Sequence, residues 1–75
     1  MKVKELIEKL QALPPDMMVI VDGYEGGVNE TSDVAVETIA LNVNQEWYYG
    51  AHDTVEEDEQ DNYPGKERVQ AVRVY

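Results

Sequence analysis

The sequence contains no cysteine, only six lysine and arginine residues, and no long hydrophobic run. Without cysteine the chain forms no disulfide and no thiolate metal site, and cysteine-dependent nucleophilic or redox chemistry is excluded. The longest apolar run, residues 17–21, is far shorter than the roughly 20 residues that a membrane-spanning helix needs. We therefore expect a cytoplasmic protein with no signal peptide and no membrane contact.

Positive charge is scarce and lies near the two ends of the chain. The 75 residues carry a net charge of −10, and thirteen acids separate Lys9 from Lys66, the next basic residue. Because phosphate neutralisation by lysine and arginine dominates nucleic-acid affinity, direct binding to nucleic acid is disfavoured. The charge favours a protein partner with a basic surface, a cation, or simple solubility.

The length predicts a single domain over residues 1–75. A chain of this size buries only about 60% of the surface that its unfolded form exposes. We therefore expect a thin core.

Helical periodicity is clearest near the N-terminus, where apolar residues recur at intervals of three and four. It predicts a helix over about residues 3–13, which Pro14 and Pro15 bring to an end. Apolar and alternating runs predict strands over about 17–22, 34–43, 46–49 and 67–75. The expected fold is α+β, with one N-terminal helix packed on a small, mainly antiparallel sheet of three to four strands. An exposed edge strand of that sheet would let two copies pair into a homodimer.

Residues 21–34 place three glycines among acids and turn-forming residues. Glycine supplies the positive φ that a phosphate-cradling loop needs, but the spacing fits no phosphate-loop template. Comparison with a calcium-binding EF-hand loop fails as well, because Tyr24 and Gly26 stand where side-chain oxygens are needed. A turn between two strands is the favoured interpretation, and a ligand or partner contact is the open alternative.

Residues 47–53 gather Trp47, two tyrosines, His52 and an aspartate. A strand here would place Trp47 and Tyr49 on one face, where core packing is favoured, and Tyr48 on the other, as a candidate interface anchor. A histidine beside a carboxylate is the arrangement of an oriented general base. No nucleophile or oxyanion donor accompanies it in the sequence, so we assign no catalytic residue.

Six acids fall within the nine residues 53–61, inside an expected acidic loop over 53–65. A solvated loop is the favoured interpretation. The alternatives are a polyanionic surface that meets an arginine- and lysine-rich groove on another protein, and weak binding of a divalent cation. The candidate acidic surface consists of Asp53, Glu56, Glu57, Asp58, Glu59 and Asp61.

The segments KELIEKLQALPPDMMVIVDGYEGG, ALNVN and WYYGAHD, taken in this order, resemble a family of short proteins from bacteriophage and prophage genomes. The resemblance covers most of residues 3–53 and has no counterpart for 55–62. It implies a bacterial cytoplasmic setting and brings no assigned activity, cofactor or catalytic residue. The residues that match its motifs are Tyr24, Glu25, Gly26, Gly27, Tyr49, Gly50 and His52. With Tyr48, they form the candidate binding site.

These features predict a non-enzymatic accessory protein that binds another protein through its glycine- and tyrosine-containing loops and its acidic surface. The alternative is a module for a small ligand or a divalent cation, in which the two loops converge on one pocket. That alternative requires Tyr24 and His52 to lie close together. We expect no cofactor, no defined metal site and no enzyme activity, because a single histidine leaves little from which to build acid-base chemistry.

Overall fold

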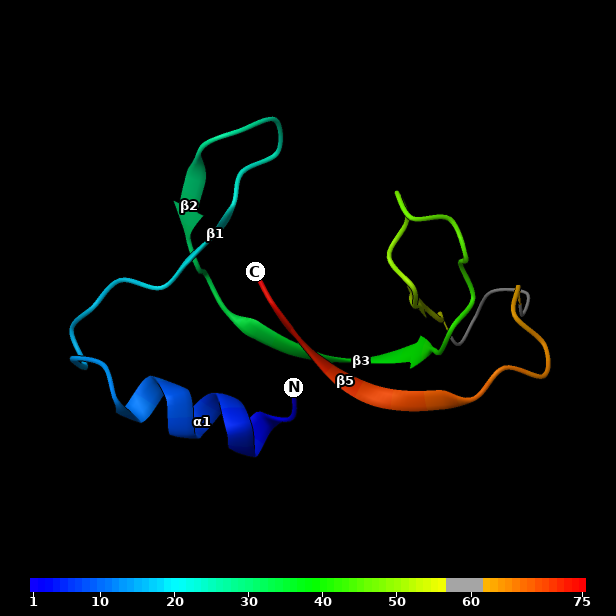
Figure 1. The fold of residues 1–75 in the computed structure, drawn as a ribbon, viewed down its shortest axis with the longest axis horizontal. Helices are drawn as coiled ribbons and strands as arrows, with labels where there is room; N and C mark the ends of the chain where they lie inside the picture. The colour runs from blue at the N-terminus through cyan, green and yellow to red at the C-terminus, as the bar shows by residue number, and fades with distance from the viewer. Residues whose placement is uncertain (57–61) are drawn as a thin grey trace. The chain divides into compact units, whose positions relative to one another are not determined.

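The computed structural model describes residues 1–56 and 62–75, and the chain divides into two compact units, Met1–Thr31 and Ser32–Tyr75. The first unit holds one helix and a two-stranded antiparallel sheet, and the second holds a three-stranded antiparallel sheet (Figure 1). The predicted α+β class, with one N-terminal helix and antiparallel strands, is confirmed. The strands form two sheets where one was expected. The single domain over residues 1–75 stays a prediction.

Helix α1 spans Val3–Gln11 and begins after Lys2, whose extended backbone places its carbonyl to accept the amides of Glu5 and Leu6. An acid in the first turn and Lys9 in the last turn complement the helix dipole. The helix ends two residues earlier than the predicted 13. Pro14 disfavours helical geometry in the residue before it, and the amide of Leu13 instead closes a tighter turn on Leu10.

No residue of α1 is buried. Its apolar face continues into the segment 13–20, and the apolar side chains along it are about half exposed: Val3, Ile7, Leu10, Leu13, Met17, Met18, Val19 and Ile20. The packing of this face over a sheet stays a prediction.

The sheet of the first unit is a hairpin of β1 (Ile20–Asp22) and β2 (Val28–Glu30), with Val21 opposite Asn29. The predicted strand over 17–22 starts late because the amide of Met17 turns back onto the carbonyl of Pro14. Strand β2 was not predicted. Two of its three residues, Asn29 and a glutamate, are types that strands usually lack, so only the pairing with β1 makes it extended.

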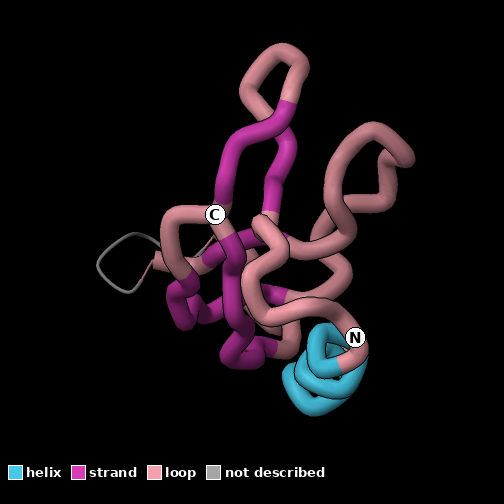
Figure 2. The backbone as a smooth tube through the Cα atoms, turned by 90° about the vertical axis from the view of Figure 1, so that its left-hand side faces the viewer, coloured by secondary structure: helices cyan, strands magenta, loops and turns pink. Residues whose placement is uncertain are grey.

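The sheet of the second unit has the order β4-β3-β5, with all neighbours antiparallel. Figure 1 labels β3 and β5, and the strands are magenta in Figure 2. Its strands are β3 (Val34–Ala40), β4 (Asp53–Thr54) and β5 (Arg68–Val74). Strand β5 agrees with the predicted 67–75 to within one residue at each end. Strand β3 ends before the predicted 43 because Asn42 takes a positive φ of 55°, which breaks the extended backbone.

The predicted strand over 46–49 is wrong. These residues form a turn in which the amide of Tyr49 donates to the carbonyl of Glu46, 3.1 Å away. The neighbour of β3 on this side is β4, which lies within the segment assigned from sequence to an acidic loop over 53–65. Aromatic residues favour strands only where a partner strand and a packed face exist, and here neither is present.

Full burial among the described residues is found at the end of the central strand β3. Among the described residues Ala40 alone is fully buried, at 0% exposure, between its partners Asp53 on β4 and Arg68 on β5. The expectation of a thin core is therefore confirmed. Within residues 1–56 and 62–75, no helix is long and apolar enough to cross a membrane.

Candidate functional site

The connection between β3 and β4, residues 41–52, carries three aromatic side chains on its surface, and we call it the aromatic loop. Trp47 is 91% exposed, and Tyr48 and Tyr49 are 62% and 61% exposed. The three rings pack against one another in order along the chain. The ring centroids of Trp47 and Tyr48 are 5.6 Å apart in an edge-to-face arrangement, and those of Tyr48 and Tyr49 are 5.0 Å apart with an interplanar angle of 49°. The predicted core packing of Trp47 and Tyr49 is wrong, because the turn does not alternate side chains between two faces.

Hydrogen bonds from Val43 and Asn44 join the two ends of the aromatic loop. The amides of Val43 and Asn44 both donate to the carbonyl of Ala51, at 2.8 and 3.2 Å. The Asn44 side chain donates through Nδ2 to the carbonyl of Gly50, 2.9 Å away. These hydrogen bonds join the two ends of residues 45–50 into a closed ring of backbone, and the three aromatic residues lie at the far end from the bonds.

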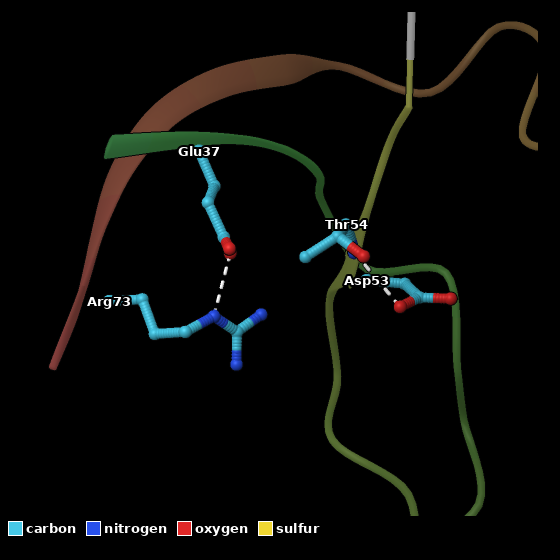
Figure 3. Close-up of polar contacts among 4 residues, drawn as sticks. All are labelled: Glu37, Asp53, Thr54 and Arg73. Carbon is cyan, nitrogen blue, oxygen red and sulfur yellow. Dashed lines mark hydrogen bonds and ion pairs between the residues drawn. The ribbon is translucent and has the colours of Figure 1, made fainter. Parts of the chain in front are cut away.

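His52 has a structural hydrogen bond at the base of the aromatic loop. Its Nδ1 accepts the backbone amide of Asn42 at 2.9 Å, which requires Nδ1 to be unprotonated. This contact holds Asn42 in its positive-φ conformation at the end of β3. Asp53 does not orient the imidazole. Among the described residues, its carboxylate accepts the amide of Thr54 and the hydroxyl of Tyr63 (Figure 3 shows the Thr54 contact).

The contact between Asp53 and Tyr63 ties the start of β4 to the segment that precedes β5. The hydrogen bond to the carboxylate raises the pKa of the Tyr63 hydroxyl above its usual value, with smaller contributions from desolvation and from the negative charge of Asp53. Lys66 adds a second tie, since its Nζ donates to the carbonyl of Asn42 at 3.2 Å. The base of the aromatic loop is thus fixed by two residues of the segment before β5, over sequence separations of 10 and 24 residues.

The hairpin of the first unit ends in residues 23–27, which we call the glycine loop. The amide of Gly23 donates to the carbonyl of Gly27 at 3.0 Å, and Gly26 and Gly27 take positive φ values of 140° and 64°. A Cβ at Gly23 would lie 2.3 Å from the carbonyl oxygen of Gly26, so no side chain fits there. A turn follows β1 as predicted, but it leads into the unpredicted β2 and not directly into the strand that begins at Val34. At its tip Tyr24 is 99% exposed.

The candidate binding residues fall into the two loops, which belong to different compact units. Tyr24, Glu25, Gly26 and Gly27 lie in the glycine loop, and Tyr48, Tyr49, Gly50 and His52 lie in the aromatic loop. All eight are exposed. Convergence of Tyr24 and His52 on one pocket stays a prediction.

Two cavities lie elsewhere. One, of about 560 Å³, is polar and lies in the second unit along β3, between residues 36–38 and 54–56, with Gln70 and Arg73 contributing from β5. The other, of about 340 Å³, is apolar and follows residues 10–19 of the first unit. Neither is lined by Tyr24 or His52.

Of the candidate acidic surface, Asp53 and Glu56 are exposed near the short strand β4. Glu57, Asp58, Glu59 and Asp61 lie outside the described residues. Within residues 1–56 and 62–75, no three histidine, aspartate or glutamate side chains gather closely enough to hold a metal ion.

Sequence reasoning missed the residues that position the aromatic loop, namely Asn42, Asn44 and Tyr63. Asparagine tolerates positive φ and bonds to nearby backbone, so two asparagines flanking a valine at the end of a strand were a signal for a structured loop. No local signal marks Tyr63, because its partner lies ten residues away.

The described chain is thus an α+β protein whose most exposed aromatic cluster lies on a loop braced by hydrogen bonds. No protein-family model, curated protein or solved structure matches this chain.

Proposed function

We propose that the protein is a non-enzymatic protein-binding module of bacterial or phage origin that acts in the cytoplasm, and that the aromatic loop is its recognition element. The observation that carries the proposal is the 91% exposure of Trp47 at the tip of a loop whose backbone is closed by hydrogen bonds. The absence of cysteine agrees with a reducing compartment.

The exposed rings offer a large binding area. An aromatic side chain buries on the order of 150–250 Å² in an interface, and each 100 Å² of apolar surface contributes roughly 2.5 kcal/mol when removed from water. Tryptophan and tyrosine are accordingly enriched among the residues that dominate protein interfaces. The closed ring of residues 45–50 is ordered before binding, so the partner does not have to offset the entropy cost of ordering it.

Charge indicates the chemistry of the partner. Glu46 precedes the three aromatic residues and Asp53 follows the loop, within a chain of net charge −10. A lysine or arginine side chain can lie over an aromatic ring and meet a carboxylate at the same time. A partner that presents arginine or lysine at its surface therefore fits this loop, and long-range attraction would speed its approach.

The test is a pull-down from bacterial lysate with the tagged protein, quantified by mass spectrometry at low and high salt. Trp47→Ala is compared with the wild type, and Tyr24→Ala serves as the matched control because it removes an exposed aromatic ring from the glycine loop. Loss of an interface anchor costs about 2 kcal/mol or more, so capture by Trp47→Ala should fall roughly thirtyfold. Tyr24→Ala should capture the same proteins as the wild type.

The captured proteins should carry basic surfaces and should be lost at high salt, since screening weakens exposed charge pairs. Equal capture by Trp47→Ala and the wild type would contradict the role of the aromatic loop. Capture lost with Tyr24→Ala instead would move the recognition element to the glycine loop.

A further inference from the structure

Strand β5 forms one edge of the three-stranded sheet, since the strand order is β4-β3-β5. It pairs along its whole length with β3, from Val34 opposite Val74 to Ala40 opposite Arg68. The pairing is one to one, without a bulge, and the strand contains neither proline nor glycine. It is therefore a continuous edge seven residues long.

The hydrogen bonds at both ends of this pairing show which backbone groups face outward. Asp33 and Tyr75 exchange amide and carbonyl, and the amide of Leu41 donates to the carbonyl of Glu67. In an antiparallel ladder alternate residues bond to the same neighbour, so the odd-numbered residues of β5 bond to β3. The amides and carbonyls of Gln70, Val72 and Val74 point away from the sheet, and no other described residue accepts or donates to them.

Natural proteins usually protect such an edge with a bulge, a proline or free charges. Here one of the two edge charges is already neutralised, because Arg73 donates through Nε to Glu37 on β3 at 2.7 Å (Figure 3). Besides Arg68, the edge strand carries three valines, Gln70 and Ala71. An unpaired edge of this kind accepts another strand.

The charges of the strands indicate which strand pairs with the β5 edge. Each of the other four strands within residues 1–56 and 62–75 contains an acid: Asp22 in β1, Glu30 in β2, Glu37 in β3 and Asp53 in β4. Strand β5 contains two arginines and no acid. In a chain of net charge −10, it is the one described strand that contains no acid, so two copies can meet along it without placing acids opposite each other.

We propose that two copies of the chain pair antiparallel along β5, about a two-fold axis at Ala71, to form a continuous six-stranded sheet. Ala71 is the middle residue of the strand, so this register gives the largest overlap. Gln70 of one copy then exchanges both hydrogen bonds with Val72 of the other. Arg73 lies beside Val69 of the partner copy, and the two Arg73 side chains do not face each other.

The dimer goes beyond the proposed function and does not depend on it. It would place an aromatic loop on each of two copies, and linked sites bind a partner with two matching sites more tightly than either site alone. A failure of the dimer therefore leaves recognition by a single loop untouched.

The first test is the mass of the full chain in solution, measured by light scattering over a dilution series. The wild type should have twice the mass of the 8.5 kDa chain at high concentration. Val72→Pro removes an outward amide without touching the bonds to β3, and it should shift the dissociation constant upward at least tenfold. Val72→Thr keeps the amide and should behave as the wild type. A wild type that is monomeric throughout, or a Val72→Pro variant as dimeric as the wild type, would overturn the proposal.

The second test reports the register and does not rely on the proline variant folding. The chain has no cysteine, so a single introduced cysteine reports only its own position. Opposite residues of a non-hydrogen-bonded antiparallel pair have Cα atoms about 4.5 Å apart, which a disulfide can span. Ala71→Cys should become a covalent dimer on mild oxidation, whereas Val36→Cys, on the highly exposed Val36 of β3, should not. Equal cross-linking of both variants would contradict the β5 interface.

Discussion

The two loops that carry the candidate site are held in different ways. The glycine loop has five residues, and its shape follows from two positive φ values and one backbone hydrogen bond within the loop. The aromatic loop has twelve residues, and it depends on side chains of Asn44 and His52 and on contacts from Lys66. A short loop can be fixed by its backbone alone, whereas a long one also needs hydrogen bonds from side chains to offset its conformational entropy.

The largest effect is expected when one methyl group is added to each loop, which tests whether the two loops differ in how tightly their backbones are constrained. In Gly23→Ala the new Cβ would lie 2.3 Å from the carbonyl oxygen of Gly26, so the backbone has to move. We expect a loss of about 2–3 kcal/mol in the free energy of unfolding of the hairpin. Gly50→Ala is the matched control in the aromatic loop, where the nearest atom, the His52 carbonyl oxygen, lies at an ordinary 3.9 Å.

Urea unfolding, with hydrogen exchange of the Val28–Glu30 amides, measures both variants. Gly50→Ala should change stability by no more than about 0.5 kcal/mol. Equal losses in the two variants would show that the glycine loop is not more tightly constrained than the aromatic loop.

A smaller loss of stability is expected when the base of the aromatic loop loses the His52 side chain that accepts the Asn42 amide. His52→Ala removes the group that accepts the Asn42 amide, and one such hydrogen bond contributes about 1 kcal/mol. His52→Asn keeps a side-chain oxygen near the same place and should retain part of this contribution. Hydrogen exchange of the Asn42 amide is the measurement, and unchanged protection in His52→Ala would argue against a supporting role for the imidazole.

The smallest effect concerns the tie between Tyr63 and Asp53. Because the folded protein raises the pKa of Tyr63, the stabilisation is present below the usual tyrosine pKa and is lost as pH rises through the raised value. Tyr63→Phe should therefore be less stable than the wild type at neutral pH, and the difference should shrink in alkaline solution. The exposed Tyr48, changed to Phe, should match the wild type at both pH values. A difference between Tyr63→Phe and the wild type that does not change with pH would exclude this hydrogen bond as its source.

The helix and the two long strands could be read from periodicity, because each is long enough for its pattern to repeat. The short strands could not. Strand β2 contains residues that disfavour strands, and β4 has two residues within an acidic stretch. Each is extended only because a neighbouring strand supplies its hydrogen bonds.

The candidate site was predictable in its residues and not in its geometry. Glycine content located the glycine loop, since positive φ is a property of a single residue. The exposure of Trp47 was not predictable, because an aromatic residue after a strand has the same local pattern whether the chain folds back at once or first forms a wide loop.

By itself, the sequence determined the α+β class, the net charge of −10, the lack of cysteine chemistry and the position of the glycine turn. These follow from composition and from contacts between near neighbours. The tertiary structure alone decided that β3 pairs with β4 and β5, that His52 bonds to Asn42 and not to Asp53, and that three aromatic rings face solvent. The physical reason is that the strand pairing and the His52 contact join residues ten or more positions apart, and that the exposure of the rings depends on the loop that this pairing leaves between β3 and β4.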